Sequence, residues 1–484
     1  MRPIISAAIR YSARGLRPPS RRFTTAGRLL QTASVQPAPS QGHSIGTNAT
    51  IKKPKSFNSG SSKNTKSTPT VSVQKNSVTL SRGQSKEPKR FSFLQLRDFC
   101  KCPKCVDPHS KQRSFRTQDI PAAIAPRSVV CDGKTLDVTW HNDIEGYDSD
   151  HVSRWDLDYL AYPVLNPHRK RGREGRQILW TRDKMQDMQH WISYDDYINN
   201  DEKFAGTMRN LIRTGLVFVK DIPQSRDMVE KIATRMGPLR NSFYGPTWDV
   251  RTVPEAKNVA YTNQFLGFHM DLLYMNEPPG YQLLHCLENS CEGGESLFVD
   301  TFQVAFTMRK TSPHLFDLLT KNYLAYEYRH ENAIYHNSRP VIQMKNDKFY
   351  RYVNYSPPFQ SLLPPVRLED GSESYSEALA FNTALKQFSD LMEQESRIFQ
   401  LKLKPGECVL FANRRVAHAR SHFNTSSGSR WLAGAYVDED AVLSSAYVSS
   451  RKHPIASDAA EPRVQRYETQ RPGEGSELEQ QTGL

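Results

Sequence analysis

The sequence predicts an α+β protein whose main part is a double-sheet barrel with flanking helices. Short apolar runs typical of strands recur between residues 216 and 438, and only two longer stretches in this region show helical periodicity. Far upstream, three cysteines crowd within six residues. They predict a small β-rich module that a bound metal ion holds together, because the sequence around them is too short of apolar residues for a core of its own.

Positive charge is concentrated at one end of the chain. The protein has 484 residues and a formal net charge of +14. Residues 1–86 contain 15 Lys or Arg and no Asp or Glu, so the other 50 basic residues are matched by 51 acidic ones. A near-neutral body lacks the basic surface that binding to a phosphate backbone requires, and we therefore expect no nucleic-acid partner.

The two ends of the chain are expected to lie outside the folded body. Residues 1–36 are rich in Arg, Ser, Ala and Thr and lack acids, which is typical of a mitochondrial transit peptide and predicts a location in the mitochondrial matrix. Residues 37–89 are polar and nearly free of aromatic residues, so we expect a linker there. Residues 451–484 are expected to form a polar tail. No apolar run approaches the ~18 residues of a membrane span.

Between these ends the pattern predicts two domains. Residues 90–168 form the metal-binding module, in which residues 135–140 resemble a strand. Residues 179–450 form the main domain. Apolar residues three or four apart predict helices in two stretches of this domain, 227–236 and 376–395. Apolar runs predict its strands at 216–219, 281–287, 296–300, 407–413 and 431–438.

His269 and Asp271 are the first pair of candidate metal ligands. On an extended strand, side chains two residues apart leave the same face. One imidazole and one carboxylate on one face are two of the three ligands of an Fe(II) facial triad, and a second His from elsewhere would complete it. His418 follows a strand-like run far downstream, and Arg430 opens the last such run.

This pattern resembles the Fe(II)- and 2-oxoglutarate-dependent dioxygenases of the taurine dioxygenase superfamily, which have His-x-Asp, a distal His and then an Arg about a dozen residues later. The resemblance implies a double-stranded β-helix of the jelly-roll or cupin type. It implies that His269, Asp271 and His418 are the catalytic, iron-binding residues. It also implies that Arg430 and Ser296 bind the cosubstrate 2-oxoglutarate, that O2 is consumed and that ascorbate is the reductant.

The cysteine cluster predicts a zinc site. Cys100, Cys102 and Cys105 can supply three thiolates to one tetrahedral Zn(II), which needs a fourth ligand. From the residues alone, the candidates for this ligand are His109, Cys131, His141 and His151. The surrounding sequence resembles the N-terminal module of the γ-butyrobetaine dioxygenase group, and that resemblance implies His151. A closed site of four protein ligands is structural and has no open position for catalysis.

Aromatic residues on both sides of the iron motif bear on the substrate. The same resemblance implies that a trimethylammonium group binds in an aromatic cage, because the faces of aromatic rings attract cations. The residues that match this cage are Tyr244, Trp248, Tyr261 and Tyr436. Asn258 matches a residue that binds the substrate carboxylate. Leu272 stands where that group has Tyr, so the chain departs from the pattern at the carboxylate end.

The resemblance therefore implies a small trimethylammonium substrate, with hydroxylation of γ-butyrobetaine to L-carnitine as the first expectation. ε-N-trimethyllysine is an alternative substrate, which Leu272 and the predicted transit peptide support. A third possibility is a different substrate. From other classes, the alternatives are a nucleic-acid binder that uses the basic tail and a barrel kept only as a scaffold. The near-neutral body argues against the first, and the complete set of iron and oxoglutarate residues argues against the second. Relatives are often homodimers, which makes a homodimer an expectation here.

Overall fold

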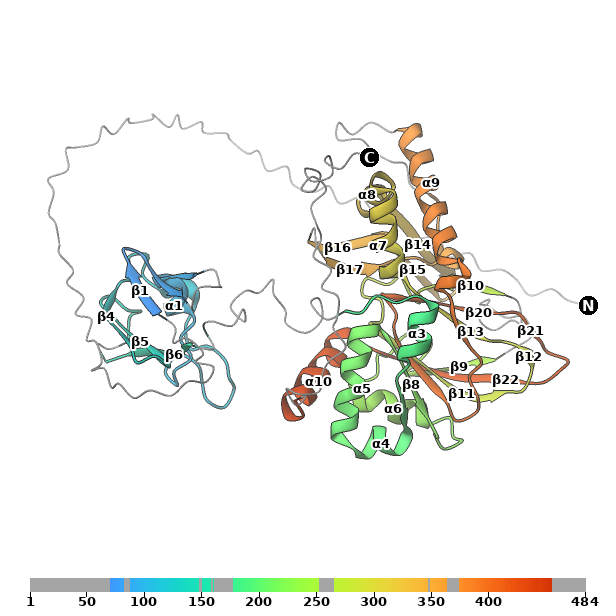
Figure 1. Ribbon diagram of the computed structural model, residues 1–484, viewed down its shortest axis with the longest axis horizontal. Coiled ribbons are helices and arrows are strands. Elements are labelled where there is room, and N and C mark those ends of the chain that lie inside the picture. Colours follow the sequence, from blue (N-terminus) through green and yellow to red (C-terminus); the bar gives the residue numbers. More distant parts are fainter. Residues whose placement is uncertain are drawn as a thin grey trace, which may run out of the picture. The chain divides into compact units, whose positions relative to one another are not determined.

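The computed structural model consists of two compact units, residues 1–161 and residues 162–484 (Figure 1). The structure describes residues 70–81, 88–147, 150–157, 160, 177–251, 265–346, 349–363 and 374–454. None of the helices in these ranges is long and apolar enough to cross a membrane.

The described part of the first unit contains two three-stranded antiparallel sheets and a short helix. The sheets have the strand orders β1-β2-β3 and β4-β5-β6. Ser92 caps the helix, and Gln95 completes a capping box with it. The elements are β1 (Thr70–Gln74), β2 (Ser77–Ser81), β3 (Lys89–Ser92), α1 (Phe93–Asp98), β4 (Pro126–Cys131), β5 (Thr135–Trp140) and β6 (Val152–Asp156).

The prediction of a linker over residues 37–89 was wrong at its C-terminal end. Residues 70–81 form β1 and β2, and Val78 and Leu80 are buried, with Val78 opposite Phe91 of β3. Apolar residues alternate in β2, and this period of two buries one face of a strand even in a polar segment. The proposed transit peptide, residues 37–69 of the linker and the tail from residue 455 lie outside the described residues.

Two facing sheets form the barrel of the second unit. The larger sheet has the order β7-β8-β19-β11-β22-β9 and the smaller one β10-β20-β13-β18. Only β7 and β8 pair in parallel among these strands. The larger sheet comprises β7 (Trp191–Ser193), β8 (Leu216–Lys220), β9 (Thr247–Arg251), β11 (Tyr281–Asn289), β19 (Cys408–Ala412) and β22 (Arg430–Val437). The smaller sheet comprises β10 (Leu266–His269), β13 (Ser296–Asp300), β18 (Phe399–Leu401) and β20 (Val416–Arg420).

Apolar side chains fill the space between these two sheets. Phe218, Leu284 and Phe411 of the larger sheet share one buried cluster with Phe298 and Phe399 of the smaller sheet. Burial of alternating residues from both inner faces is the packing of a double-sheet barrel. The structure therefore confirms the double-sheet barrel that the sequence predicts.

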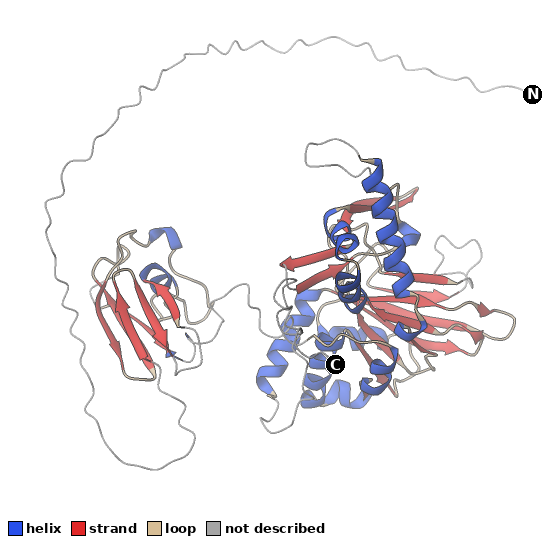
Figure 2. Cartoon of the chain, turned by 45° about the horizontal axis from the view of Figure 1, so that its top comes forward, coloured by secondary structure: helices blue, strands red, loops and turns tan. Residues whose placement is uncertain are grey.

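Helices cover the barrel on both sides (Figure 2). Helices α4, α5, α6 and α10 pack on the outer face of the larger sheet, and α7, α8 and α9 pack together with two hairpins beside the smaller sheet. Both predicted helices of the main domain are confirmed as α6 and α9. The helices are α3 (Arg182–Met188), α4 (Tyr194–Asn199), α5 (Asp201–Thr214), α6 (Met228–Met236), α7 (Thr301–Thr311), α8 (Pro313–Lys321), α9 (Tyr375–Met392) and α10 (Glu439–Lys452). The remaining strands are β12 (Glu292–Gly293), β14 (Tyr323–His330), β15 (Ala333–Pro340), β16 (Ile342–Asn346), β17 (Phe349–Val353) and β21 (Phe423–Asn424).

Candidate active site

Two neighbouring strands of the smaller sheet bring three candidate metal ligands together. His269 ends β10 and His418 is the central residue of β20, and the two lie opposite each other in the antiparallel pair. Asp271 follows β10. Its Oδ1 lies 3.4 Å from Nε2 of His269 and 4.0 Å from Nε2 of His418. The structure therefore brings together the predicted triad from two distant parts of the chain.

Hydrogen bonds to the backbone orient His269 and hold the turn at Asp271. Nδ1 of His269 donates to the carbonyl of Gly267 over 2.8 Å, which leaves Nε2 as the atom that faces Asp271. Asn413 Oδ1 accepts from the backbone N–H of Asp271 over 2.8 Å, and Asn413 Nδ2 donates to the carbonyl of Asp271 over 3.0 Å. Leu272 follows with a φ of +59°, which non-glycine residues rarely adopt. Asn413 thus holds a strained turn at the metal-ligand pair.

Burial and neighbouring charges shift the pKa values of Asp271 and His418. Burial raises the pKa of Asp271, but the interactions with His269 and His418 outweigh it and hold that pKa well below its usual range. Burial, followed by repulsion from His269, lowers the pKa of His418 to about 3. A carboxylate and a neutral imidazole are the forms in which these side chains bind metals. The two histidines and the carboxylate therefore fit the donor set of an Fe(II) facial triad.

A pocket with about 760 Å³ of empty space, partly open to solvent, lies beside the triad and between the two sheets. The predicted site residues among its lining are His269, Asp271, His418, Ser296, Arg430, Tyr244, Trp248 and Tyr436. Asn258 and Tyr261 lie outside the described residues, and their roles stay predictions. Eight residues chosen from sequence patterns therefore share one pocket.

Arg430 is a buried positive charge at this pocket. It opens β22 and is 7% exposed, and burial lowers its pKa to about 10, so it remains protonated at neutral pH. No carboxylate in the described ranges forms an ion pair with it. Gly294 has a φ of +75°, and a Cβ there would lie 3.2 Å from Cδ of Arg430, so glycine both adopts this turn and leaves room for the arginine. A planar guanidinium in this setting suits a carboxylate ligand.

Trp248 and Tyr436 form an aromatic wall of the pocket. Trp248 of β9 lies opposite Gly434 of β22, and a Cβ on Gly434 would lie 2.5–2.7 Å from three ring atoms of Trp248. The Trp248 ring also stacks on Tyr436, with centroids 3.9 Å apart. The hydroxyl of Tyr436 donates to Oδ2 of Asp271 over 2.6 Å. Burial, and then Asp271, raise the pKa of Tyr436 well above its usual value.

Some residues that line the pocket were missed from the sequence. They are Tyr274, Gln282, Phe359 and Arg420. Tyr274 is 1% exposed, and its ring contacts Phe243 and two tyrosines of the β14–β15 hairpin. An aromatic residue three positions after Asp271 was visible in the sequence. The inward direction of Gln282 and Arg420 depends on sheet pairing, for which the sequence carries no local signal.

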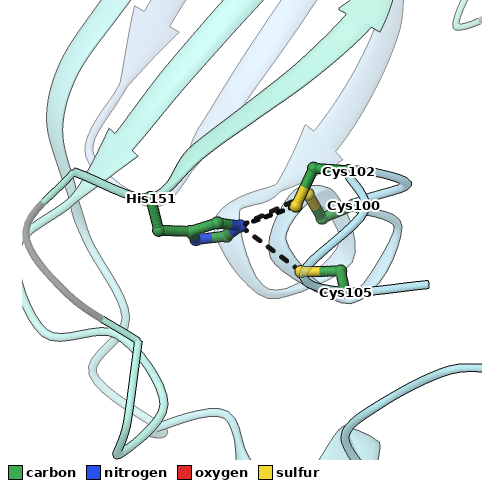
Figure 3. A group of neighbouring side chains, drawn as sticks. All are labelled: Cys100, Cys102, Cys105 and His151. Carbon is green, nitrogen blue, oxygen red and sulfur yellow. Dashed lines mark hydrogen bonds between the residues drawn. The ribbon is translucent and has the colours of Figure 1, made fainter. Parts of the chain in front are cut away.

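In the first unit, three cysteines and a histidine meet (Figure 3). Nε2 of His151 lies 3.5 Å, 3.4 Å and 3.3 Å from the sulfurs of Cys100, Cys102 and Cys105, respectively. A tetrahedral zinc ion with Zn–S of ~2.3 Å and Zn–N of ~2.0 Å requires about 3.5 Å between sulfur and nitrogen. Hydrogen bonding from Cys105 lowers the pKa of Cys100, and the same contact raises the pKa of Cys105, so a thiolate is favoured at Cys100. The four predicted ligands therefore fit a closed zinc site.

Asp143 and Arg97 support the cysteine and histidine group. Oδ2 of Asp143 accepts a hydrogen bond from Nδ1 of His151 over 2.6 Å. The buried guanidinium of Arg97 donates to Asp143 and lies 3.4 Å from Sγ of Cys105. A carboxylate on the far nitrogen orients a ligating imidazole, so these two residues extend the site by a second layer.

The chain matches two known protein families and several characterised proteins. Residues 183–436 match the family described as taurine catabolism dioxygenase TauD, TfdA family, and residues 71–160 match the gamma-butyrobetaine hydroxylase-like, N-terminal family. Dioxygenase str8 of Strobilurus tenacellus is 32% identical over 73% of this chain and 83% of its own length. The mitochondrial trimethyllysine dioxygenase of Rattus norvegicus is 30% identical over 74% of this chain and 82% of its own. The gamma-butyrobetaine dioxygenase of Homo sapiens is 27% identical over 74% of this chain and 90% of its own length.

The first of these family matches extends over more than half of the chain and contains the strands that hold the triad and the pocket. The two facing sheets agree with the double-sheet barrel that the resemblance to this family implies. The chain belongs to the TauD, TfdA family and is a 2-oxoglutarate-dependent dioxygenase.

Proposed function

We propose that this dioxygenase hydroxylates γ-butyrobetaine to L-carnitine. The observation that carries the proposal is that Tyr244, Trp248 and Tyr436 line the same pocket as the triad. An aromatic face attracts a quaternary ammonium ion by about 0.5–2 kcal/mol once water is excluded. A trimethylammonium group held by these rings would direct a carbon a few bonds away toward the metal ligands.

In this proposal His269, Asp271 and His418 hold Fe(II), and Arg430 pairs with the distal carboxylate of 2-oxoglutarate beside Ser296. Bound iron would activate O2, of which one atom would enter a substrate C–H bond and the other succinate, as 2-oxoglutarate loses CO2. Ascorbate keeps the iron reduced. The chain's own residues bind and orient the two organic molecules and exclude water from the reacting carbon.

ε-N-trimethyllysine is the second candidate substrate. It carries the same cation, so the aromatic wall would accept it. Leu272 lines the pocket where the γ-butyrobetaine dioxygenase group has a tyrosine. The trimethyllysine dioxygenases of Rattus norvegicus and Homo sapiens are 30% and 29% identical to this chain, against 27% for the human gamma-butyrobetaine dioxygenase. Leu272 is the specific feature that favours this alternative.

One assay separates the two substrates. The full chain is incubated with Fe(II), ascorbate, O2 and 2-oxoglutarate, and γ-butyrobetaine and trimethyllysine are offered in parallel. We expect succinate and a product heavier by one oxygen atom from γ-butyrobetaine. Oxidation of trimethyllysine alone would overturn the first choice, and oxidation of neither would overturn the trimethylammonium proposal. His418→Ala, which removes one triad ligand, is expected to abolish both products.

The first unit is proposed to hold one structural Zn(II) through Cys100, Cys102, Cys105 and His151. The sulfur-to-nitrogen distances of 3.3–3.5 Å support this assignment. Four protein ligands close the coordination sphere, so the ion would stabilise the fold of this unit and take no part in oxidation.

The mitochondrial matrix is proposed as the location of the protein. The acid-free, arginine-rich residues 1–36 support it, and the trimethyllysine dioxygenases named above are mitochondrial proteins.

A further inference from the structure

We infer that Tyr436 positions the metal-binding carboxylate in addition to lining the substrate pocket; this inference rests on the proposed function, in which Asp271 binds Fe(II). The two carboxylate oxygens of Asp271 have different partners. Oδ2 accepts the hydroxyl of Tyr436 over 2.6 Å, whereas Oδ1 is the oxygen that lies 3.4 Å from Nε2 of His269. One oxygen is thus directed to the metal ligands and the other is held by the tyrosine.

This division favours a single bond between Asp271 and a metal ion. Three protein ligand atoms leave the other positions around the ion open. In the proposed function the cosubstrate would take two of them, and O2 would take another. A second bond from Asp271 would fill one of these positions. A hydrogen bond to an ionised oxygen is about twice as strong as one between neutral groups, so Tyr436 opposes that second bond.

The surroundings of Tyr436 keep its hydroxyl in place. The residue is 2% exposed and lies in β22, between β11 and β9. It is opposite Gln282 of β11, and its ring stacks on Trp248 with centroids 3.9 Å apart. A ring fixed by strand pairing and by stacking has little freedom to turn its hydroxyl away from Asp271. One side chain therefore connects the wall assigned to the ammonium group with a metal ligand.

Metal binding to the metal-free full chain tests this role without turnover. Mn(II) is titrated calorimetrically into the wild type and into Tyr436→Phe, which keeps the ring and removes the hydroxyl. We expect Tyr436→Phe to bind Mn(II) at least about tenfold more weakly, because Asp271 loses the hydrogen bond that orients its metal-facing oxygen, and this loss outweighs the second bond that the freed Oδ2 could form. Tyr197→Phe is the matched control, because it removes a buried hydroxyl that donates to the Ile232 carbonyl, away from the pocket. Its Mn(II) affinity should equal that of the wild type.

Trp248→Phe distinguishes the contribution of the Tyr436 hydroxyl from that of ring stacking. It disturbs the stack and keeps the hydroxyl. It should weaken γ-butyrobetaine binding and lower Mn(II) affinity by less than Tyr436→Phe does, because strand pairing still holds Tyr436. Thermal unfolding of the metal-free variants checks that Tyr436→Phe loses no more stability than Tyr197→Phe. The role of Tyr436 would be overturned, with the proposed iron site still standing, by either of two results. One is wild-type Mn(II) affinity in Tyr436→Phe, and the other is an equal loss of Mn(II) affinity in Tyr436→Phe and Trp248→Phe. Failure of the wild type to bind Mn(II) would overturn the proposed iron site together with this role.

Discussion

At the scale of single residues, Gly434 decides whether Trp248 can line the pocket. In Gly434→Ala the new Cβ would lie 2.5–2.7 Å from ring atoms of Trp248, so the ring must move. Overpacking of this kind costs about 1–3 kcal/mol. We expect the KM for a trimethylammonium substrate to rise by about tenfold, which corresponds to the loss of about 1.4 kcal/mol of cation–aromatic contact with the displaced Trp248 ring. Calorimetric titration should show that 2-oxoglutarate binding is unchanged.

Gly206→Ala is the matched control for this substitution. It lies in α5, where a Cβ would be 3.8 Å from the nearest side-chain atom, in Arg209. Alanine is the better helix former, so this variant should be slightly more stable and fully active. Equal weakening of substrate and 2-oxoglutarate binding in Gly434→Ala would contradict a specific effect on Trp248.

The residues that the sequence could predict are those whose type limits their role. His269, Asp271 and His418 are metal-ligating types at a distinctive spacing, and Arg430 is a cation that opens an apolar strand. Asn413 could not be predicted, because it acts through backbone groups of Asp271 that only the fold brings near. Pocket residues without a distinctive type depend in the same way on which face of a strand turns inward.

At the scale of elements, the segment between β5 and β6 supports the proposed zinc site through Asp143. Asp143→Asn keeps an oxygen near Nδ1 of His151 but loses the negative charge that also pairs with Arg97. We expect zinc affinity to fall about 10- to 100-fold in competition with a chromophoric chelator. Asp137→Asn is the control, because it makes the same change at an ion pair with the largely exposed Arg154 of β6. Equal zinc affinity in both variants would count against the role of Asp143.

Secondary structure can be predicted where apolar residues recur with one clear period. It cannot be predicted from the average composition of a long segment. The spacing of Met228, Ile232 and Met236 identified α6, and all three are buried. The first hairpin was missed because Ser and Thr dominate its surroundings, although Val78 and Leu80 alternate in the strand period. The polar composition of residues 37–89 as a whole outweighed the alternating pattern of the five residues of β2.

At the scale of the whole molecule, the class of the barrel could be predicted and its topology could not. Short apolar strands with a few helices indicate two packed sheets. The order β10-β20-β13-β18 joins strands that are far apart in the chain, and it is this pairing that sets His269 opposite His418. Long-range strand pairing leaves no local mark in a single sequence. The resemblance therefore predicts which residues form the triad, and strand pairing in the fold brings them together.

Charge along the whole chain leads to the last prediction. Fifteen basic residues and no acids precede residue 87, so this segment before the barrel carries a charge of +15 and the rest of the chain carries −1. An amphipathic basic leader is drawn across the inner mitochondrial membrane by the membrane potential, which attracts its positive charge. A fusion of residues 1–36 to a fluorescent protein should therefore collect in mitochondria. Replacing its arginines with glutamine should leave the fusion in the cytosol, because the driving charge is lost. Cytosolic fluorescence of the unmodified fusion would contradict a mitochondrial targeting signal in this segment. Loss of oxidation after removal of residues 1–36 from the purified enzyme would instead assign the segment to the folded protein.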